Sequence, residues 1–212
     1  MIEPTEVCLT VDTEFSIGGA FANPTRHCPI GEDRVYCPIE GRDHGLGFIL
    51  RTLKAHDQQA TFFVETANVA YFGDHPMGRV VETLLEGGQD VQLHLHPCWQ
   101  VFKDDAWPDR VIDGAPNDQC ASLPDDQLTA LIGDGIDSFA RWGAKKPIAL
   151  RTGNLSAGQN VYRAMSRAGL ALGSNIAAGY APPSEKSLML MGGLSRIEDV
   201  VEAPVLSYAQ FR

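Results

Sequence analysis

Residues 90–96, with the sequence D-V-Q-L-H-L-H, carry the pattern that decides the fold. The run is short and has apolar residues at alternate positions, which predicts a β-strand. Further strands are expected at residues 7–14, 60–65, 148–152, 170–175 and 200–206. Helical segments separate these strands. Repeated strand–helix units predict a parallel sheet, either open or closed into a barrel.

Four amphipathic helices are predicted from apolar residues at helical spacing. Their apolar positions are Leu46, Ile49, Leu50 and Leu53; Val80, Val81, Leu84 and Leu85; Leu128, Leu131, Ile132, Ile136 and Phe139; and Val161, Ala164, Met165 and Ala168. The third helix follows Ser122, and Asp125 lies three residues on, a pattern typical of a capping box. We therefore expect Ser122 to cap that helix.

Loop lengths indicate where a functional site would lie. Returns from a helix to the next strand are short, whereas long segments follow strand ends at residues 15–43, 97–121 and 176–186. A single long loop is readily explained as a tolerated surface insertion. In parallel α/β folds, however, ligands bind at the carboxyl ends of the strands. We expect a site at that edge of the sheet.

Composition excludes several classes of function. The 212 residues suffice for one domain, and a hydrophobic fraction of 44% is typical of a globular protein. The net charge of −10 disfavours nucleic acid and polybasic membrane binding. No apolar run reaches the ~18–20 residues of a membrane span, and no secretory signal is visible. Five cysteines, an odd number, indicate reduced thiols, so a cytoplasmic location is expected.

An acid pair ends the first predicted strand. Asp12 and Glu14 share one face because strand side chains alternate. Two neighbouring carboxylates repel each other unless a cation or an arginine stands between them, which favours a metal. The alternative is a pair of ordinary solvated acids at a strand end.

A histidine pair ends the strand at residues 90–96. His94 and His96 share one face with Gln92, and two imidazoles so placed can converge on one zinc-like cation. A lone histidine is more often a structural residue, but a pair opposite an acid pair favours metal ligation. Arg151 ends the strand at residues 148–152, and its permanent charge could orient an anionic base. Its alternative is a surface arginine.

Four further residues are candidates for substrate contact. Aromatic rings can stack on the apolar face of a sugar, and such rings occur after His96. The alternative is that they pack the long loop onto the fold. Polar residues at other strand ends could also face a substrate. The candidates are Trp99, Trp107, Glu65 and Asn154.

Four segments together resemble the polysaccharide deacetylase family, also called carbohydrate esterase family four. They are L-T-V-D-T-E at residues 9–14, A-T-F-F-V-E at 60–65, D-V-Q-L-H-L-H-P at 90–97 and L-R-T-G-N at 150–154. The resemblance runs over nearly the whole chain and implies an α/β fold, a distorted (β/α)7 barrel. It also implies a divalent metal, usually zinc, and removal of acetyl groups from N-acetylated sugars.

Carried over to this chain, the resemblance makes Asp12 the catalytic base and Arg151 the residue that orients it. Glu14 and His94 would be metal ligands. The family's second histidine comes four residues after the first, whereas His96 comes after two. His96 is therefore the expected third ligand, with Cys98 as a remote substitute.

One expected element of the family is missing. No histidine follows His96, although the family uses a late histidine to protonate the leaving amine. We therefore expect residues 1–212 to form a single deacetylase-like domain that lacks the last strand and its motif. Such a protein would continue beyond Arg212 or be open beside residues 7–14. Otherwise His27, His44 or His75 would supply the proton, or the protein would bind without catalysis.

The sequence thus predicts a metal-dependent hydrolase that removes N-acetyl groups from a sugar or polysaccharide. Two alternatives remain. One is a carbohydrate-binding or scaffold protein with a degenerate site. The other is a metal-free glycosidase that uses Asp12 and Glu14, which would give the histidine pair no role.

Overall fold

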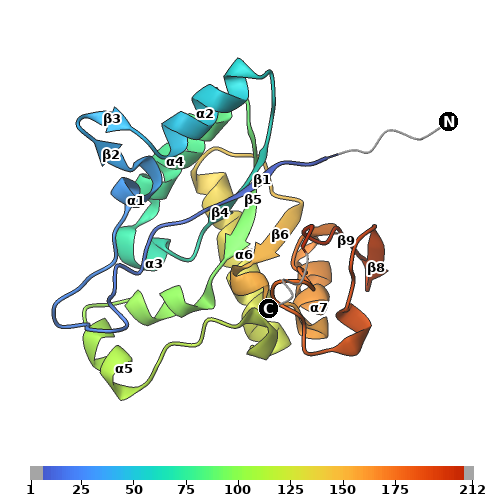
Figure 1. The fold of residues 1–212 in the computed structure, drawn as a ribbon. Coiled ribbons are helices and arrows are strands. Elements are labelled where there is room, and N and C mark those ends of the chain that lie inside the picture. The colour runs from blue at the N-terminus through green and yellow to red at the C-terminus, as the bar shows by residue number, and fades with distance from the viewer. Residues whose placement is uncertain (1–6, 208–212) are drawn as a thin grey trace, which may run out of the picture.

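A mostly parallel β-sheet lies at the centre of the molecule (Figure 1). The computed structural model describes residues 7–207. Within that part, one sheet has the strand order β1-β4-β5-β6-β7-β9-β8. The strands are β1 (Thr10–Thr13), β4 (Thr61–Glu65), β5 (Asp90–Leu95), β6 (Ala149–Thr152), β7 (Leu172–Gly173), β8 (Ser195–Ile197) and β9 (Val200–Glu202). Neighbours pair in parallel, except that β8 is antiparallel to β9. The expected α/β fold class is confirmed.

The sheet is open rather than closed into a barrel in residues 7–207. Strand β1 pairs with β4 on one side, and β8 forms the opposite edge. The opening lies beside the first predicted strand, where the sequence led us to expect it. The side chains of Val7 and Leu9 are 78% and 44% exposed there, as expected at a sheet edge.

Four helices follow the predicted amphipathic segments. They are α2 (Leu46–Ala55), α4 (Asp74–Glu86), α6 (Asp125–Arg141) and α7 (Gln159–Ala168). Helices α4 and α6 both pack against β5. In α6, the glycine at position 135 lies so close to Leu93 of β5 that a Cβ there would approach its side chain to 2.7 Å. The absence of a side chain at this position therefore lets α6 pack closely against β5.

The predicted capping box of α6 is wrong. The helix begins at Asp125, directly after Pro124, and it has no side-chain cap. Ser122 lies instead in the short 3-10 helix η2 (Cys120–Ser122). Its hydroxyl donates to the carbonyl of Gln119 and accepts the amide of Asn117, so it is unavailable to the helix.

The long segments after the strands carry small elements of their own. The first holds α1 (Glu32–Tyr36), β2 (Pro38–Ile39) and β3 (Arg42–Asp43), and α3 (Val69–Phe72) follows β4. The segment after β5 holds η1 (Pro97–Phe102), α5 (Trp107–Asp113) and η2. Two further 3-10 turns, η3 (Gly153–Leu155) and η4 (Lys186–Leu188), follow β6 and β7. None of the helices in residues 7–207 has the length and apolarity needed to cross a membrane.

Strand register divides the side chains between two faces. Leu93 pairs with Leu150, and both are fully buried under the helices. Their neighbours His94 and Arg151 pair in turn and point to the opposite face. Glu65 pairs with His94, so polar groups gather where β4, β5 and β6 end.

Candidate metal centre

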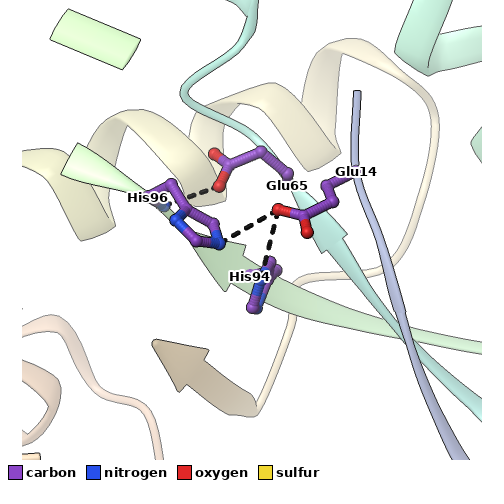
Figure 2. A group of neighbouring side chains, drawn as sticks. All are labelled: Glu14, Glu65, His94 and His96. Atoms are coloured by element: carbon purple, nitrogen blue, oxygen red, sulfur yellow. Dashed lines mark hydrogen bonds and ion pairs between the residues drawn. The ribbon is translucent and has the colours of Figure 1, made fainter. Parts of the chain in front are cut away.

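Glu14 and the histidine pair meet at the carboxyl ends of β1 and β5 (Figure 2). Glu14 Oε2 lies 3.0 Å from His96 Nε2 and 3.9 Å from His94 Nε2. One ligand atom from each of these residues, together with one from Glu65, lies within 4.8 Å of the others. The structure thus brings together the three residues expected to be ligands, although their role as ligands stays a prediction.

His94 is held in a form suited to ligation. Its ring is 2% exposed, and its Nδ1 donates to the backbone carbonyl of Arg151 at 2.8 Å. Burial lowers the pKa of His94, which favours the neutral imidazole. With Nδ1 protonated, the lone pair lies on Nε2 and faces Glu14.

His96 is held at its other ring nitrogen by a carboxylate. Its Nδ1 lies 2.8 Å from Oδ2 of Asp118. Burial by itself would lower the pKa of His96, but hydrogen bonds to Asp118, Cys98 and Glu14 outweigh it and raise that pKa well above its usual range. The surroundings of this ring therefore favour positive charge, and a bound cation satisfies them as well as a proton does.

Two glutamates complete the group and differ in character. Glu14 is an exposed residue whose carboxyl group is partly desolvated. Desolvation alone would raise the pKa of Glu14, but the neighbouring His96 and His94 lower it. Glu65 is fully buried, and burial raises its pKa to about 8. Its two oxygens accept backbone N–H groups from Ala67 at 2.5 Å and from His96 at 2.6 Å. Glu14 is thus the ionised carboxylate of the group, and Glu65 fixes the backbone beside it.

Asp12 and Arg151 form an ion pair next to this group. Arg151 Nη1 donates to Asp12 Oδ1 at 2.8 Å, and Nη2 donates to Thr10 and Ser174. The guanidinium is 5% exposed and lies 4.3 Å from the centre of the Phe63 ring. Arg151 is therefore no surface arginine, and it fixes the orientation of Asp12.

Three of the four residues expected to contact substrate do not face solvent. Trp99 and Trp107 are 1% and 9% exposed, and both pack against Phe102, with ring centres at 5.3 and 5.0 Å. Their rings fasten the long loop to the core and present no free face to a sugar. Glu65 is likewise buried with both oxygens engaged. Burial speaks against substrate contact for these three residues, which stays an untested prediction.

Asn154 is exposed, but its amide is already engaged. Nδ2 donates to the carbonyl of Asp118 at 3.1 Å and to its carboxylate at 2.7 Å. Asn154 thus contacts Asp118, the residue that bonds to His96, and its contact with a substrate stays a prediction. Asp118 itself was not predicted from the sequence, because it lies 22 residues beyond His96 in a loop, and no spacing rule connects the two.

The donor set fits a divalent cation of the zinc type. Two imidazole nitrogens and a carboxylate are common zinc ligands, and ligands of one zinc ion lie no more than about 4.4 Å apart. The distances from Glu14 to both histidines are below that limit. The other ring nitrogen of each histidine is bound to an acceptor, as is usual for metal-binding histidines.

Cys98 is a poor substitute ligand. It is buried, and burial raises the pKa of its thiol to about 12. It groups with His96 and Asp118, and it is absent from the group that Glu14 forms with both histidines. We therefore retain His96 as the third ligand.

Comparisons with known proteins establish the fold. No protein-family model matches the sequence, and no curated protein matches it. A crystal structure assigned as a polysaccharide deacetylase from Mycobacterium smegmatis aligns with a TM-score of 0.59 at 14% identity, over 93% of this chain and 57% of that one. The deacetylase PplD from Streptococcus pyogenes, in complex with acetate, aligns with a TM-score of 0.50 at 13% identity, over 94% of this chain and 64% of that one.

The chain therefore has the fold of the polysaccharide deacetylases, and the resemblance inferred from four sequence segments is confirmed at that level. It spans roughly three fifths of the length of these two structures, 57% and 64%. At such low identity the likeness concerns the fold alone.

Proposed function

We propose that this protein is a metal-dependent hydrolase that removes N-acetyl groups from a carbohydrate. The observation that carries the proposal is the convergence of Glu14, His94 and His96 beside the Asp12–Arg151 pair. The two aligned structures support it, because both are described as deacetylases. The acid side chains at the site are about two fifths exposed, 39% for Asp12 and 43% for Glu14, so a bulky substrate can reach them.

Glu14, His94 and His96 would hold the ion, which when bound polarises the acetyl carbonyl and acidifies water. Asp12 takes the proton from the attacking water as general base. Arg151 keeps that carboxylate aimed through a 2.8 Å contact and neutralises part of its charge. Attack by the water oxygen forms the new C–O bond; the amide C–N bond then breaks as the leaving nitrogen takes up the proton that Asp12 removed, and the products are acetate and the amino sugar.

Binding without turnover is the second candidate, and one observation favours it. In residues 7–207, His94 and His96 are the histidines that contact Glu14, and both use Nδ1 for an internal hydrogen bond. Neither is free to protonate a leaving amine. The other expected proton donors, His27, His44 and His75, are exposed. His75 lies on α4, in a groove that Arg79 and Trp142 also line.

The metal-free glycosidase has less support. Such an enzyme needs one protonated carboxyl as an acid and a second one as a base or nucleophile. The carboxyl of Asp12 is engaged by the guanidinium of Arg151, and two histidines lower the pKa of Glu14, so Glu14 is held as a carboxylate. Glu14 is therefore not placed to donate a proton.

Acetate release from N-acetylglucosamine oligomers, with zinc or cobalt added, tests the proposal. Turnover on the order of 1–10³ per second supports a complete hydrolase. Metal and oligosaccharide binding without acetate release supports the second candidate. Absence of metal binding in the purified wild-type protein contradicts the proposed function.

A further inference from the structure

His96 lies at a position where the sheet does not fix its side chain. Strand β5 ends at Leu95, and His96 follows as the first residue of the loop. Its backbone N–H is held by Glu65, but that contact leaves the ring free to rotate. Because a strand-end ligand with a free ring binds metal weakly, another group must orient it.

Asp118 supplies that contact from the far end of the same loop. Its Oδ2 accepts from His96 Nδ1 at 2.8 Å and from Asn154 Nδ2 at 2.7 Å. A carboxylate oxygen only accepts hydrogen bonds and has no proton to donate to the ring. His96 Nδ1 must therefore donate, and its lone pair is left on Nε2, which faces Glu14.

The loop that carries Asp118 is anchored directly after that residue, by contacts with two other segments of the chain. The N–H of Ala121 donates to Ser156 Oγ at 3.0 Å, and Asn160 Nδ2 donates to the carbonyls of Cys120 and Leu123 at 3.0 and 2.8 Å. These bonds tie residues 118–123 to the segment after β6 and to α7. Asp118 is thus positioned by the fold and does not depend on a flexible loop.

The segment after β6 is shaped for the same ring. A Cβ at position 153 would lie 2.3 Å from two atoms of the His96 imidazole, so only glycine fits there. The next residue, Asn154, has φ 56°, a left-handed conformation that asparagine tolerates better than most residues. This turn brings the Asn154 amide onto Asp118.

We propose that Asp118, held by Asn154, is a positioning residue that fixes the tautomer and ring plane of His96 for metal binding. The inference rests on the metal site of the proposed function. It assigns the pair a role in ligand geometry and none in contact with substrate.

Zinc affinity of variants, measured by competition with a chromophoric chelator, tests this role. Asp118→Ala removes the acceptor and should weaken zinc binding about 10–100-fold. Asp118→Asn should lose only a few fold of affinity, because Asn154 donates to the same atom and keeps the amide oxygen toward His96. In the double variant Asp118→Asn, Asn154→Ala that amide is free to rotate, and the loss should return to the level of Asp118→Ala. Asp109→Asn, exposed on α5, is the matched control.

The His96 Nδ1 proton gives a second readout that is independent of activity. In the zinc-loaded wild type and in Asp118→Asn it should appear in NMR spectra as a slowly exchanging proton, and in Asp118→Ala it should be lost. Wild-type zinc affinity in both Asp118→Ala and the double variant would overturn the inference. Zinc binding with this pattern but no acetate release would contradict the proposed function alone, and a wild type that binds no zinc would contradict both.

Discussion

At the scale of single residues, the proposed reaction requires Asp12 to act as a base on water beside the proposed metal ligands. Asp12→Asn keeps an oxygen that can accept from Arg151, so the local structure should survive. It removes the basic carboxylate, and kcat for deacetylation should fall about 10²–10⁴-fold. Zinc affinity should change by no more than a few fold. Loss of zinc together with activity would show that Asp12 is a ligand and not the base.

Gly153 gives a residue-scale prediction about space. Gly153→Ala would drive a Cβ into the His96 ring, so we expect zinc affinity to fall at least about tenfold as the ring is displaced. Gly133→Ala is the matched control, because a Cβ at that position of α6 meets nothing within 4 Å. That variant should instead gain about 0.5–1 kcal/mol of stability from helix propensity. Chelator competition and thermal unfolding of both variants provide the measurement.

At the scale of elements, hydrogen bonds from side chains supplement the few backbone hydrogen bonds between the short strands β7 and β9. Strand β7 has two residues and β9 has three. The buried Glu202, the last residue of β9, accepts the backbone N–H groups of Asn175 and Ile176, which follow β7, at 2.7 and 3.0 Å. Asn175 Oδ1 in turn accepts the N–H of Thr152 at 2.8 Å. Two polar side chains thus join the ends of β6, β7 and β9.

This bridge predicts a pH dependence of stability. Burial raises the pKa of Glu202 in the folded state above the unfolded value of 4.5, although backbone N–H groups oppose the change. The stability that Glu202 contributes is therefore fully present below about pH 4.5 and is lost as pH rises through the folded pKa. Glu202→Gln keeps an acceptor and cannot ionise, so its unfolding free energy should decline less as pH rises. Denaturant titrations between pH 4 and 9 would measure the difference.

Glu202→Ala separates the bridge from its charge. It leaves two buried N–H groups without an acceptor, at a cost of about 1–3 kcal/mol each. If Glu202→Ala were as stable as Glu202→Gln at every pH, the bridge would have no structural role.

Sequence periodicity located these elements better than it located their ends. Strands at residues 60–65 and 90–96 were placed within one residue, because both are apolar runs buried by helices. The strand predicted at residues 170–175 is only Leu172–Gly173 in the structure. Asn175 bonds to the N–H of Thr152 through its side chain and does not extend the strand. Strand β8 was missed because S-R-I is too short to show a period.

The candidate site shows a similar division. Asp12, Glu14, His94, His96 and Arg151 could be predicted, because strand alternation and strand ends are local features of the chain. Asp118 could not, since its contact with His96 arises from the path of a long loop. The burial of the two tryptophans could not be predicted, because aromatic rings suit a loop core and a sugar-binding surface equally well in a sequence.

At the scale of the whole molecule, the residues of the candidate site connect the edge strand β1 to the central strands β5 and β6. Strand β1 has one neighbour in residues 7–207, yet Asp12 reaches Arg151 of β6 and Glu14 reaches His94 and His96. A metal bound by these residues would clip β1 to β5 across β4. Its binding should add about 2.7 kcal/mol of stability at a zinc concentration of 100 times Kd.

Metal removal should therefore loosen one strand more than the rest. With a chelator, amide hydrogen exchange of Thr10–Thr13 in β1 should accelerate, while exchange of Ala149–Thr152 in β6 should change little. Hydrogen-exchange mass spectrometry with and without zinc measures both strands at once. Equal acceleration in both would indicate that the metal stabilises the fold globally and does not clip β1.

The contact between Asp12 and Arg151 joins positions 139 residues apart in the chain. On a ribosome that adds about 5–20 residues per second, the first partner waits about 7–28 seconds for the second to be made. During that interval Asp12 is a carboxylate without its guanidinium, on a strand whose neighbours are still being synthesised. Asp12, the proposed general base, therefore acquires its orientation only late in biosynthesis, and a nascent chain that stops before residue 151 should be catalytically silent.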